Sequence, residues 1–428
     1  MAVVRPFCGV RYDPTRVDLS KVIVPPYDVI APDERASFFD RDPHNAVRFE
    51  LTRRVSDEAR TDYSEIAATL AEWRRSGVLV RDDRPVYYVM RQRFAAPDGQ
   101  RLERIGFFGE LALEDYAARV VRPHERTLAG PKADRLKLLR AVQANLSSVF
   151  LLYEDREREL AGVLAAALET GSVGEARDDA DVEYTLALLD DSAAIETVRA
   201  FLESRPVVMA DGHHRYESAL AYRDERRAAA GNPESATPPP SESMLAYFAN
   251  AFAPGSLLLP IHRVILREPA PSYGEWCQRL GGWHSKVVSV TAAEAVPDLL
   301  AEHLAPHAGN PAFAADDGSG QLYLFFRDEP LAGELMVRVI EREALSGVFG
   351  LSPDAIRDGA VSFPKSALRA ARDVRTGAGR VALYLNPLSA DDVFRVTGEG
   401  DVMPQKSTFF YPKIPTGLVF RVHERAQP

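Results

Sequence analysis

The segment 207–217 constrains the fold of this 428-residue chain more than any other stretch. It begins as an apolar run of Val-Val-Met-Ala and then meets Asp-Gly, which predicts a strand that ends in a tight turn. Good helix formers occupy residues 216–230, so a helix is expected soon after the turn. The chain therefore passes from a strand to a helix N-terminus within a few residues.

Chemically active side chains crowd this strand–helix junction. Within seven positions the sequence places Asp211, Gly212, His213, His214, Arg215 and Glu217. Backbone N–H groups and the positive end of the helix dipole favour anions at such a junction. A polar surface turn is the alternative interpretation, but this density of imidazole, guanidinium and carboxylate groups favours a site.

The composition is that of a soluble globular protein, with 46% hydrophobic and 27% charged residues. A chain of this length is expected to form two domains. The net charge of −10 excludes broad nonspecific nucleic-acid binding, which needs a basic face. Two distant cysteines, Cys8 and Cys277, give no disulfide framework or zinc spacing. With no apolar signal or membrane span in the sequence, a cytoplasmic protein without membrane contact is expected.

Strands and helices alternate between residues 149 and 230, which predicts an α+β protein with mixed sheets and packed helices. Residues 85–113 predict a β-hairpin. No GxGxxG or GxxxxGK[ST] motif follows these strands, so neither a Rossmann nor a P-loop domain is expected. The Pro/Gly/Ser-rich segment 229–243 is interpreted as a flexible insertion, because 244–251 predicts a further buried element of the same core. The predicted domains are therefore an N-terminal α+β domain over 1–255 and a C-terminal α+β region over 256–428.

Two further stretches near the N-terminal half carry candidate site residues. Pro25 and Pro26 end a strand and present Tyr27 and Asp28, although a purely structural proline corner is the alternative. The Pro- and Gly-bounded loop 122–135 supplies His124, Glu125, Arg126, Lys132 and Arg135. A helix expected from residue 133 would place the last two at its start, where an anion can bridge them. A solvated charged loop is the competing interpretation.

The segment 403–418 near the end of the chain combines oxyanion-binding groups with aromatic rings. Its candidates are Lys406, Ser407, Thr408 and Lys413, beside three consecutive aromatic residues at 409–411. Pro412 and Pro415 restrict the backbone of this segment. An aromatic plug that closes the core is the alternative. We expect this segment to return to the site, so that it, the 122–135 loop, the 211–217 junction and Tyr27–Asp28 converge on one pocket.

Taken together, these motifs resemble the bacterial and archaeal family called domain of unknown function 1015. The motifs that carry the resemblance are Pro-Pro-Tyr-Asp-Val-Ile (25–30), His-Glu-Arg-Thr (124–127), Gly-Pro-Lys-Ala-Asp-Arg (130–135), Ala-Asp-Gly-His-His-Arg-Tyr-Glu (210–217) and Gln-Lys-Ser-Thr-Phe-Phe-Tyr-Pro-Lys-Ile-Pro-Thr-Gly (405–417). The five residues 211–215 also resemble a turn in the ParB/sulfiredoxin-like superfamily, which includes ADP- or ATP-dependent free-serine kinases. That resemblance implies a related core fold, in which Asp211, Gly212, His213 and Arg215 face nucleotide phosphates.

The leading hypothesis is phosphoryl transfer involving a small hydroxylated metabolite such as serine or phosphoserine, with ATP or ADP and Mg²⁺ as cofactors. The expected phosphate contacts are Arg215, Lys132, Arg135 and Lys406. His213 and His214 would donate to phosphate or move protons. The Mg²⁺ ligand or base would be one of Asp211, Glu217 and Asp28, and the sequence leaves this choice open.

Two other classes of protein remain as alternatives. A metal-dependent hydrolase would use His213 or His214 with Asp211 and Glu217 as metal ligands. His214 and Glu217 are three residues apart and therefore share a helix face. A ParB-like regulatory or nucleic-acid-binding protein is the second alternative. The acidic charge balance and the absence of a basic recognition helix count against it.

Overall fold

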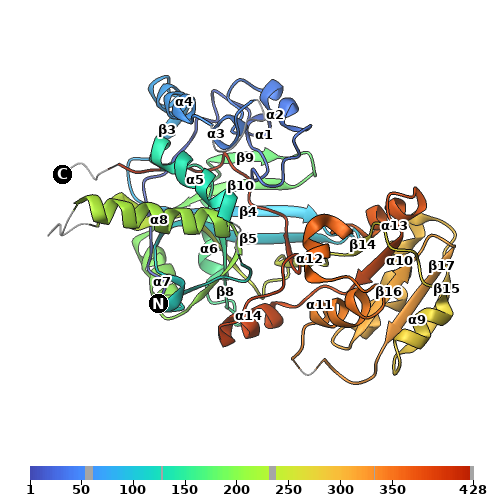
Figure 1. Ribbon diagram of the computed structural model, residues 1–428. Helices are drawn as coiled ribbons and strands as arrows, with labels where there is room; N and C mark the ends of the chain where they lie inside the picture. The colour runs from blue at the N-terminus through green and yellow to red at the C-terminus, as the bar shows by residue number, and fades with distance from the viewer. Residues whose placement is uncertain (54–60, 127–128, 231–237, 332, 425–428) are drawn as a thin grey trace. The chain divides into compact units, whose positions relative to one another are not determined.

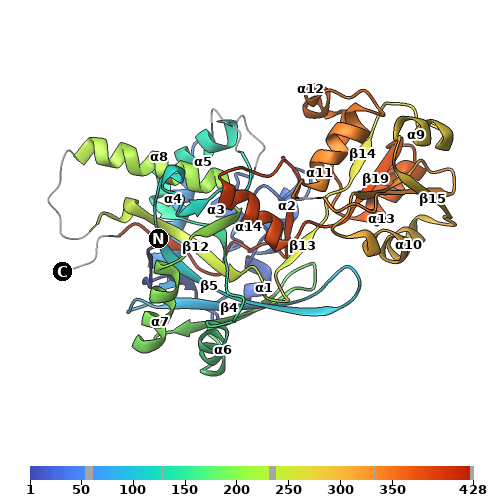
Figure 2. The same cartoon turned by 90° about the horizontal axis from the view of Figure 1, so that it is seen from below.

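The computed structural model describes residues 1–53, 61–126, 129–230, 238–331 and 333–424 (Figures 1 and 2). The protein is of the α+β class, and its chain divides into two compact units. Unit 1 contains residues 1–257, 397–402 and 412–428, and unit 2 contains residues 258–396 and 403–411. The predicted domain boundary at 255/256 stays a prediction. Residues 231–237 of the predicted insertion 229–243 lie outside the described residues.

Unit 1 is built on a nine-stranded mixed sheet with the strand order β6-β11-β8-β12-β5-β4-β10-β9, to which β1 adds by pairing with β5. Its strands are β1 (Val4–Arg5), β4 (Tyr87–Ala95), β5 (Arg101–Ala112), β6 (Val121–Arg122), β8 (Val149–Tyr153), β9 (Gly174–Arg177), β10 (Glu183–Leu189), β11 (Val207–Asp211) and β12 (Ser243–Asn250). The pairs β11/β6 and β12/β8 are parallel, whereas β4 and β5 form the predicted antiparallel hairpin. β12 is fully buried and is the predicted buried element at 244–251.

Helices pack against this sheet, and successive side chains of each strand point to opposite faces, so that both faces of the fully buried strands β8 and β12 are covered. The helices of unit 1 are α1 (Leu19–Val22), α2 (Arg35–Arg41), α3 (Val47–Glu50), α4 (Ser64–Arg75), α5 (Ala129–Val142), α6 (Ala161–Glu169), α7 (Ser192–Glu203) and α8 (His213–Ala230). Alternate residues of β8, β11 and β12, such as Val207 and Met209, form one core cluster with buried residues of α6, α7 and α8. Both views show α5 and α8 side by side (Figures 1 and 2).

The segment 412–424 is bound into unit 1 by pairings with distant parts of the chain. Isolated bridges join Val24 to Thr416 and Val10 to Phe420. The short strand β21 (Arg421–Val422) pairs with β7 (Ala144–Asn145), and a further small sheet joins β2 (Val10–Tyr12) to β3 (Leu79–Arg81). The end of the described chain is therefore a structural part of the unit that residues 1–257 begin.

Unit 2 contains a six-stranded antiparallel sheet with the order β15-β17-β16-β19-β14-β18. Its strands are β14 (Arg263–Ile265), β15 (His284–Ser289), β16 (Ala312–Asp316), β17 (Gln321–Phe326), β18 (Val361–Ser362) and β19 (Val381–Leu385), and the short strands β13 (Leu257–Leu259) and β20 (Phe409–Tyr411) lie outside this sheet. Its helices are α9 (Tyr273–Arg279), α10 (Val296–His303), α11 (Met336–Val339), α12 (Pro353–Ala355), α13 (Ala367–Arg375) and α14 (Ala390–Glu399), the last of which ends in residues assigned to unit 1. One face packs on α9 and α11 and the other on α10 and α13, so the sheet has helices on both faces. Within the described residues, no helix is long and apolar enough to span a membrane.

Candidate functional site

Asp211 is the centre of a buried group of charges at the end of β11. Its Oδ2 accepts a hydrogen bond of 2.9 Å from Arg215 Nη2, four residues later on α8. Its Oδ1 accepts another of 2.9 Å from Lys413 Nζ, which lies 202 positions further along the chain. One carboxylate is therefore held between two cations, one from the local helix and one from the segment 412–424.

A β-bulge directs Asp211 to this place. Simple alternation would put Asp211 on the same sheet face as Val207 and Met209, which belong to the apolar core. The register between β11 and β8 shifts after Met209, so that Asp211 pairs with Phe150. Between these two pairs β11 has one residue more than β8, so the side chain of Asp211 points to the opposite face of the sheet from Met209. Bulges often redirect a side chain in this way beside functional sites.

Gly212 makes the turn from this strand into α8. Its φ of 91° lies in the left-handed region that favours glycine. A Cβ at this position would lie 3.0 Å from Val149 and 3.1 Å from the guanidinium of Arg215. The turn needs a single residue, and α8 consequently begins at His213, three residues before the predicted start at 216.

Arg215 is nine-tenths buried but only partly satisfied. Besides its bond to Asp211, its Nη1 donates to the backbone carbonyl of Ser148. Its Nε is buried and has no hydrogen-bond partner among the described residues. The hydroxyl of Ser148 is likewise buried without a partner there. Unsatisfied buried donors are rare in folded proteins and call for a physical explanation such as a ligand or water.

The pKa values in this cluster reflect burial and neighbouring charges. Burial would raise the pKa of Asp211, but Lys413 and Arg215 hold it well below its usual range. Burial raises the pKa of Asp28, and the nearby carboxylate of Asp211 raises it further. The positive charges of Arg215 and Lys413 oppose this shift. Asp28 nevertheless presents an exposed surface. We call Asp28, Asp211, Arg215 and Lys413 the Asp211 cluster.

Two buried imidazoles lie beside the Asp211 cluster. The rings of His124 and His213 meet edge to face with centroids 4.7 Å apart. The backbone N–H of His124 donates to Nε2 of His213 at 3.3 Å, so Nδ1 of His213 carries the proton, 3.8 Å from Glu125. Nδ1 of His124 contacts the carbonyl of Met209 and must donate to it, which leaves Nε2 as the basic nitrogen. Burial lowers the pKa of both histidines, so both are neutral at pH 7.

The other residues predicted around the junction have more varied surroundings. Lys132 forms an ion pair of 3.2 Å with Glu217 across α5 and α8. Arg126 is exposed and His214 is half-buried. Because α5 begins at Ala129 rather than at residue 133, Lys132 and Arg135 lie within its first two turns. The sequence interval 127–128 of the predicted loop lies outside the described residues.

Arg135 belongs to a second buried charge group, the Arg135 cluster of Glu50, Tyr63, Asp134, Arg135 and Thr416. Its Nη1 donates to Glu50 Oε2 at 3.2 Å, and its Nη2 donates to Asp134 Oδ2 at 2.6 Å. Tyr63 also bonds to Asp134, and Thr416 donates to the other oxygen of Glu50 at 2.8 Å. The guanidinium lies 4.2 Å from the ring centroid of Tyr27, whose pKa burial raises to about 12.

Sequence reasoning missed Glu50, Tyr63 and Asp134 of this cluster. Asp134 adjoins Arg135 within a recognised motif, so its position carried a usable signal. Glu50 closes a short apolar helix and is 1% exposed, and nothing in the neighbouring sequence marks it as the partner of an arginine 85 residues away.

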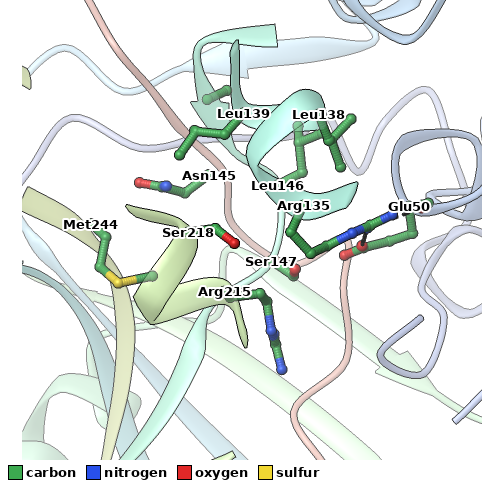
Figure 3. Close-up of a pocket in the computed structure, with 11 residues that line it drawn as sticks. Glu50, Arg135, Leu138, Leu139, Asn145, Leu146, Ser147, Arg215, Ser218 and Met244 are labelled. Carbon is green, nitrogen blue, oxygen red and sulfur yellow. Dashed lines mark hydrogen bonds and ion pairs between the residues drawn. The ribbon is translucent and has the colours of Figure 1, made fainter. Parts of the chain in front are cut away.

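A small pocket of about 50 Å³ lies between α5 and α8 and borders both clusters (Figure 3). It is lined by Glu50, Arg135, Leu138, Leu139, Ala144, Asn145, Leu146, Ser147, Arg215, Ser218 and Met244. Figure 3 shows the facing charged groups of Glu50 and Arg135 at one side and Asn145 and Met244 at the other. The pocket has room for a few water molecules and not for a nucleotide.

Unit 2 contains the three remaining residues of the predicted site. Ser407 is buried and donates to the carbonyl of Pro404 within its own turn. Lys406 is exposed with a φ of 58°, and Thr408 is half-buried. Their participation in a site with the residues of unit 1 stays a prediction. Unit 1 itself brings together Tyr27, Asp28, His124, Arg135, the 211–217 junction and Lys413.

The candidate metal ligands do not form a preformed set. Glu217 pairs with Lys132, whereas Asp211 pairs with Arg215 and Lys413. Over the described ranges of the chain, no group of three or more His, Cys, Asp or Glu side chains is arranged to hold a metal ion. The hydrolase hypothesis thus has no ligand set among these residues to support it.

The fold and this charge arrangement define a two-unit α+β protein with a buried, partly unsatisfied ion-pair cluster at a strand–helix junction. The family model described as "Protein of unknown function (DUF1015)" matches residues 4–318. The chain therefore belongs to the DUF1015 family, as the sequence motifs predicted. No curated protein matches the sequence.

Solved structures with similar folds include a conserved hypothetical protein from Pyrococcus furiosus, which is 12% identical with a TM-score of 0.33, covering 74% of this chain and 95% of that one. A free serine kinase in complex with AMP is 12% identical with a TM-score of 0.33, covering 73% and 91%. SbnI with a C-terminal truncation, from Staphylococcus aureus, is 12% identical with a TM-score of 0.31, covering 70% and 83%. Similarities of this size carry no argument about the activity of this chain.

Proposed function

We propose that this protein transfers a phosphoryl group between a nucleotide, ATP or ADP, and a small hydroxylated metabolite of the serine or phosphoserine type. The observation that carries the proposal is the position of Asp211 between Arg215 and Lys413 at the junction of β11 and α8. Phosphoryl transfer depends mainly on positioned cations and donors around the phosphates. The first turn of α8 adds backbone N–H groups and the positive end of its dipole.

The charge balance supports a nucleotide that arrives together with Mg²⁺. Three cations, Arg135, Arg215 and Lys413, are set against the four carboxylates Asp28, Glu50, Asp134 and Asp211. A polyphosphate alone would add negative charge to a region without excess positive charge. Among these carboxylates, Asp28 is exposed and crowded by a second carboxylate, so it fits a Mg²⁺ ligand best. Bound Mg²⁺ would supply neutralisation of the phosphate oxygens.

The remaining groups of the site suit binding and proton transfer. Arg215 Nε, which has no hydrogen-bond partner in the described part of the chain, can donate to a ligand oxygen while Nη2 keeps its bond to Asp211. The neutral imidazoles of His124 and His213 lie beside the Asp211 cluster and suit proton transfer. Asp28 is the second candidate base, because its raised pKa makes its carboxylate a better proton acceptor.

Isothermal titration with MgADP and MgATP tests the proposal. Arg215→Lys keeps the charge but loses the fork geometry that serves Asp211 and a ligand together, so we expect the affinity to fall about tenfold or more. Arg226→Lys is the matched control, since Arg226 is an exposed residue of the same helix. Its affinity should equal that of the unmodified protein.

Two results would count against the proposal. One is that neither nucleotide binds the unmodified, folded protein in the presence of Mg²⁺. The other is that Arg215→Lys binds nucleotide as tightly as Arg226→Lys while circular dichroism shows both to be folded. Omitting Mg²⁺ should itself weaken binding strongly, which separates the charge-balance argument from the role of Arg215.

A further inference from the structure

Gln92 and Arg104 form a buried polar pair in the middle of the β4/β5 hairpin. They are register partners across the two strands, and they are 0% and 1% exposed. Both Nε and Nη2 of Arg104 donate to Oε1 of Gln92, at 2.9 and 2.6 Å. Large polar side chains are seldom placed in a sheet core unless they satisfy other polar groups.

The backbone of the segment 412–424 is what this pair satisfies. Arg104 Nη2 also donates to the carbonyl of Pro412, and Gln92 Nε2 donates to the carbonyl of Lys413 at 3.3 Å. Two consecutive carbonyls of an irregular stretch are thus bonded by side chains from two adjacent strands. Buried backbone carbonyls outside regular structure need such partners.

The pair lies on the sheet face to which the bulge directs Asp211. The guanidinium of Arg104 lies 4.8 Å from the ring centroid of Phe150, and Phe150 is the register partner of Asp211 on β8. Lys413 is consequently held at two points: its carbonyl is bonded by Gln92, and its Nζ by Asp211. A lysine side chain carries much rotamer freedom, so fixing its backbone reduces the entropy cost of placing its ammonium group.

We propose that Gln92 and Arg104 are positioning residues that hold the backbone at 412–413 and thereby place the Lys413 ammonium at Asp211. Gln92 bonds to the carbonyl of Lys413 and Arg104 bonds to the carbonyl of Pro412, so both act through the backbone that carries the Lys413 side chain. The placement of Lys413 stands on geometry alone. Its effect on ligand affinity rests on the proposed function.

Amine footprinting of the full-length protein tests the placement without any ligand. Limited acetic anhydride labels lysines according to their access and freedom, and mass spectrometry compares Lys413 with Lys286, which is exposed in unit 2. Gln92→Glu keeps an acceptor for Arg104 but removes the donor to the carbonyl of Lys413. We expect labelling of Lys413 to rise about fivefold relative to Lys286, which is the change that loss of one hydrogen bond produces.

Two further variants complete the design. Gln92→Met removes both functions of the amide and should raise Lys413 labelling at least as much as Gln92→Glu. Arg93→Met is the matched control, because Arg93 follows Gln92 on β4, points to the other face and pairs with Glu103 at the surface. Arg93→Met should leave Lys413 labelling unchanged.

The possible results distinguish the positioning role of Gln92 and Arg104 from the proposed function. Unchanged Lys413 labelling in both Gln92 variants, with melting curves that show a folded protein, would overturn the positioning role. Raised labelling together with weaker MgADP binding supports both this role and the proposed function. Raised labelling in a protein that binds no nucleotide in any form supports the positioning role and rejects the proposed function.

Discussion

Arg135 and Arg215, two of the arginines with buried side chains in unit 1, differ in how completely their nitrogens are bonded. In Arg135, 6% exposed, all three nitrogens bond to Glu50, Asp134 or Tyr63. In Arg215, 9% exposed, Nη1 and Nη2 are bonded but the buried Nε has no partner among the described residues. Both side chains line the same small pocket.

This difference indicates that one arginine has a structural role and the other a binding role. A completed set of buried hydrogen bonds recovers the cost of removing charges from water and fixes the structure around it. An incomplete set leaves a donor that can bond to a ligand. Buried donors without a partner in the protein are rare and are expected mainly at functional sites. We therefore interpret the Arg135 cluster as scaffold and the Asp211 cluster as the site that the scaffold supports.

The largest expected effect is on the scaffold arginine. Arg135→Met leaves the carboxylates of Glu50 and Asp134 buried without their main cation, so the free energy of unfolding should fall by about 3–5 kcal/mol in urea denaturation. Arg140→Met, on the same helix α5, breaks the exposed pair with Glu225 and should cost less than about 1 kcal/mol. Equal costs for the two variants would remove the distinction between scaffold and site.

Acid should destabilise the histidine pair next to the site before it affects Asp211. Burial lowers the folded-state pKa of His124 and His213, so below about pH 6.5 the unfolded chain binds protons that the folded chain cannot. The free energy of unfolding should then fall by about 1.4 kcal/mol per pH unit for each imidazole. His262 in unit 2 adds to the slope, because burial lowers its pKa to about 3.

Asp211 also loses its contribution to stability in acid, but over a lower pH range than the histidines. Its folded-state pKa is lowered, so its contribution is complete above about pH 4 and is lost only as the pH falls through the lower folded value. Melting curves between pH 7 and pH 4.5 therefore report on the histidines. His213→Gln should reduce the slope by about one proton, and an unaltered slope would contradict the neutral, buried state of His213.

A smaller effect of opposite sign is expected at Asp28. Because its folded-state pKa is raised, the ionised carboxylate disfavours folding at neutral pH, and the penalty vanishes in acid where Asp28 is protonated in both states. Asp28→Asn should raise the melting temperature slightly at pH 7, have no effect near pH 3, and weaken binding of Mg-nucleotide. A lower melting temperature at pH 7 would identify Asp28 as a structural partner of the cations instead.

The smallest change in stability is expected at Lys132, which belongs neither to the Arg135 cluster nor to the Asp211 cluster as defined above. Its ion pair with Glu217 is partly exposed, so Lys132→Met should change the free energy of unfolding by less than about 1 kcal/mol. The affinity of Lys132→Met for MgADP, measured by titration, then shows whether Lys132 contributes to nucleotide binding. Weaker binding with unchanged stability joins Lys132 to the site, whereas unchanged binding assigns it to the surface.

The features that sequence patterns predicted are those set by neighbouring residues. The hairpin of β4 and β5, the buried strand β12 and the turn of Asp211 and Gly212 follow from local periodicity and turn chemistry. Asp211 and Arg215 were predicted together because both belong to the short junction between a strand and a helix N-terminus. These local signals also placed the junction correctly within the α+β class.

The features that escaped prediction depend on contacts over long sequence distances. The bulge after Met209 appears only in the pairing of β11 with β8, and Glu50 meets Arg135 across 85 positions. Gln92 and Arg104 sit in a segment that the sequence identifies simply as hairpin, although their partners lie more than 300 residues later. Local periodicity contains no information about which distant backbone a buried polar residue will bond.

The return of residues 412–424 to unit 1 also sets an order of events during synthesis. Lys413 leaves the ribosome 202 residues after Asp211, which at about 5–20 residues per second is a delay of roughly 10–40 seconds. In that interval Gln92, Arg104 and Asp211 lack the bonds that they make to residues 412 and 413 in the finished protein. A chain that stalls or terminates anywhere in unit 2 therefore has the ion pair of Asp211 with Arg215 but not the one with Lys413, so the Asp211 cluster is completed only by the last part of the chain to be made.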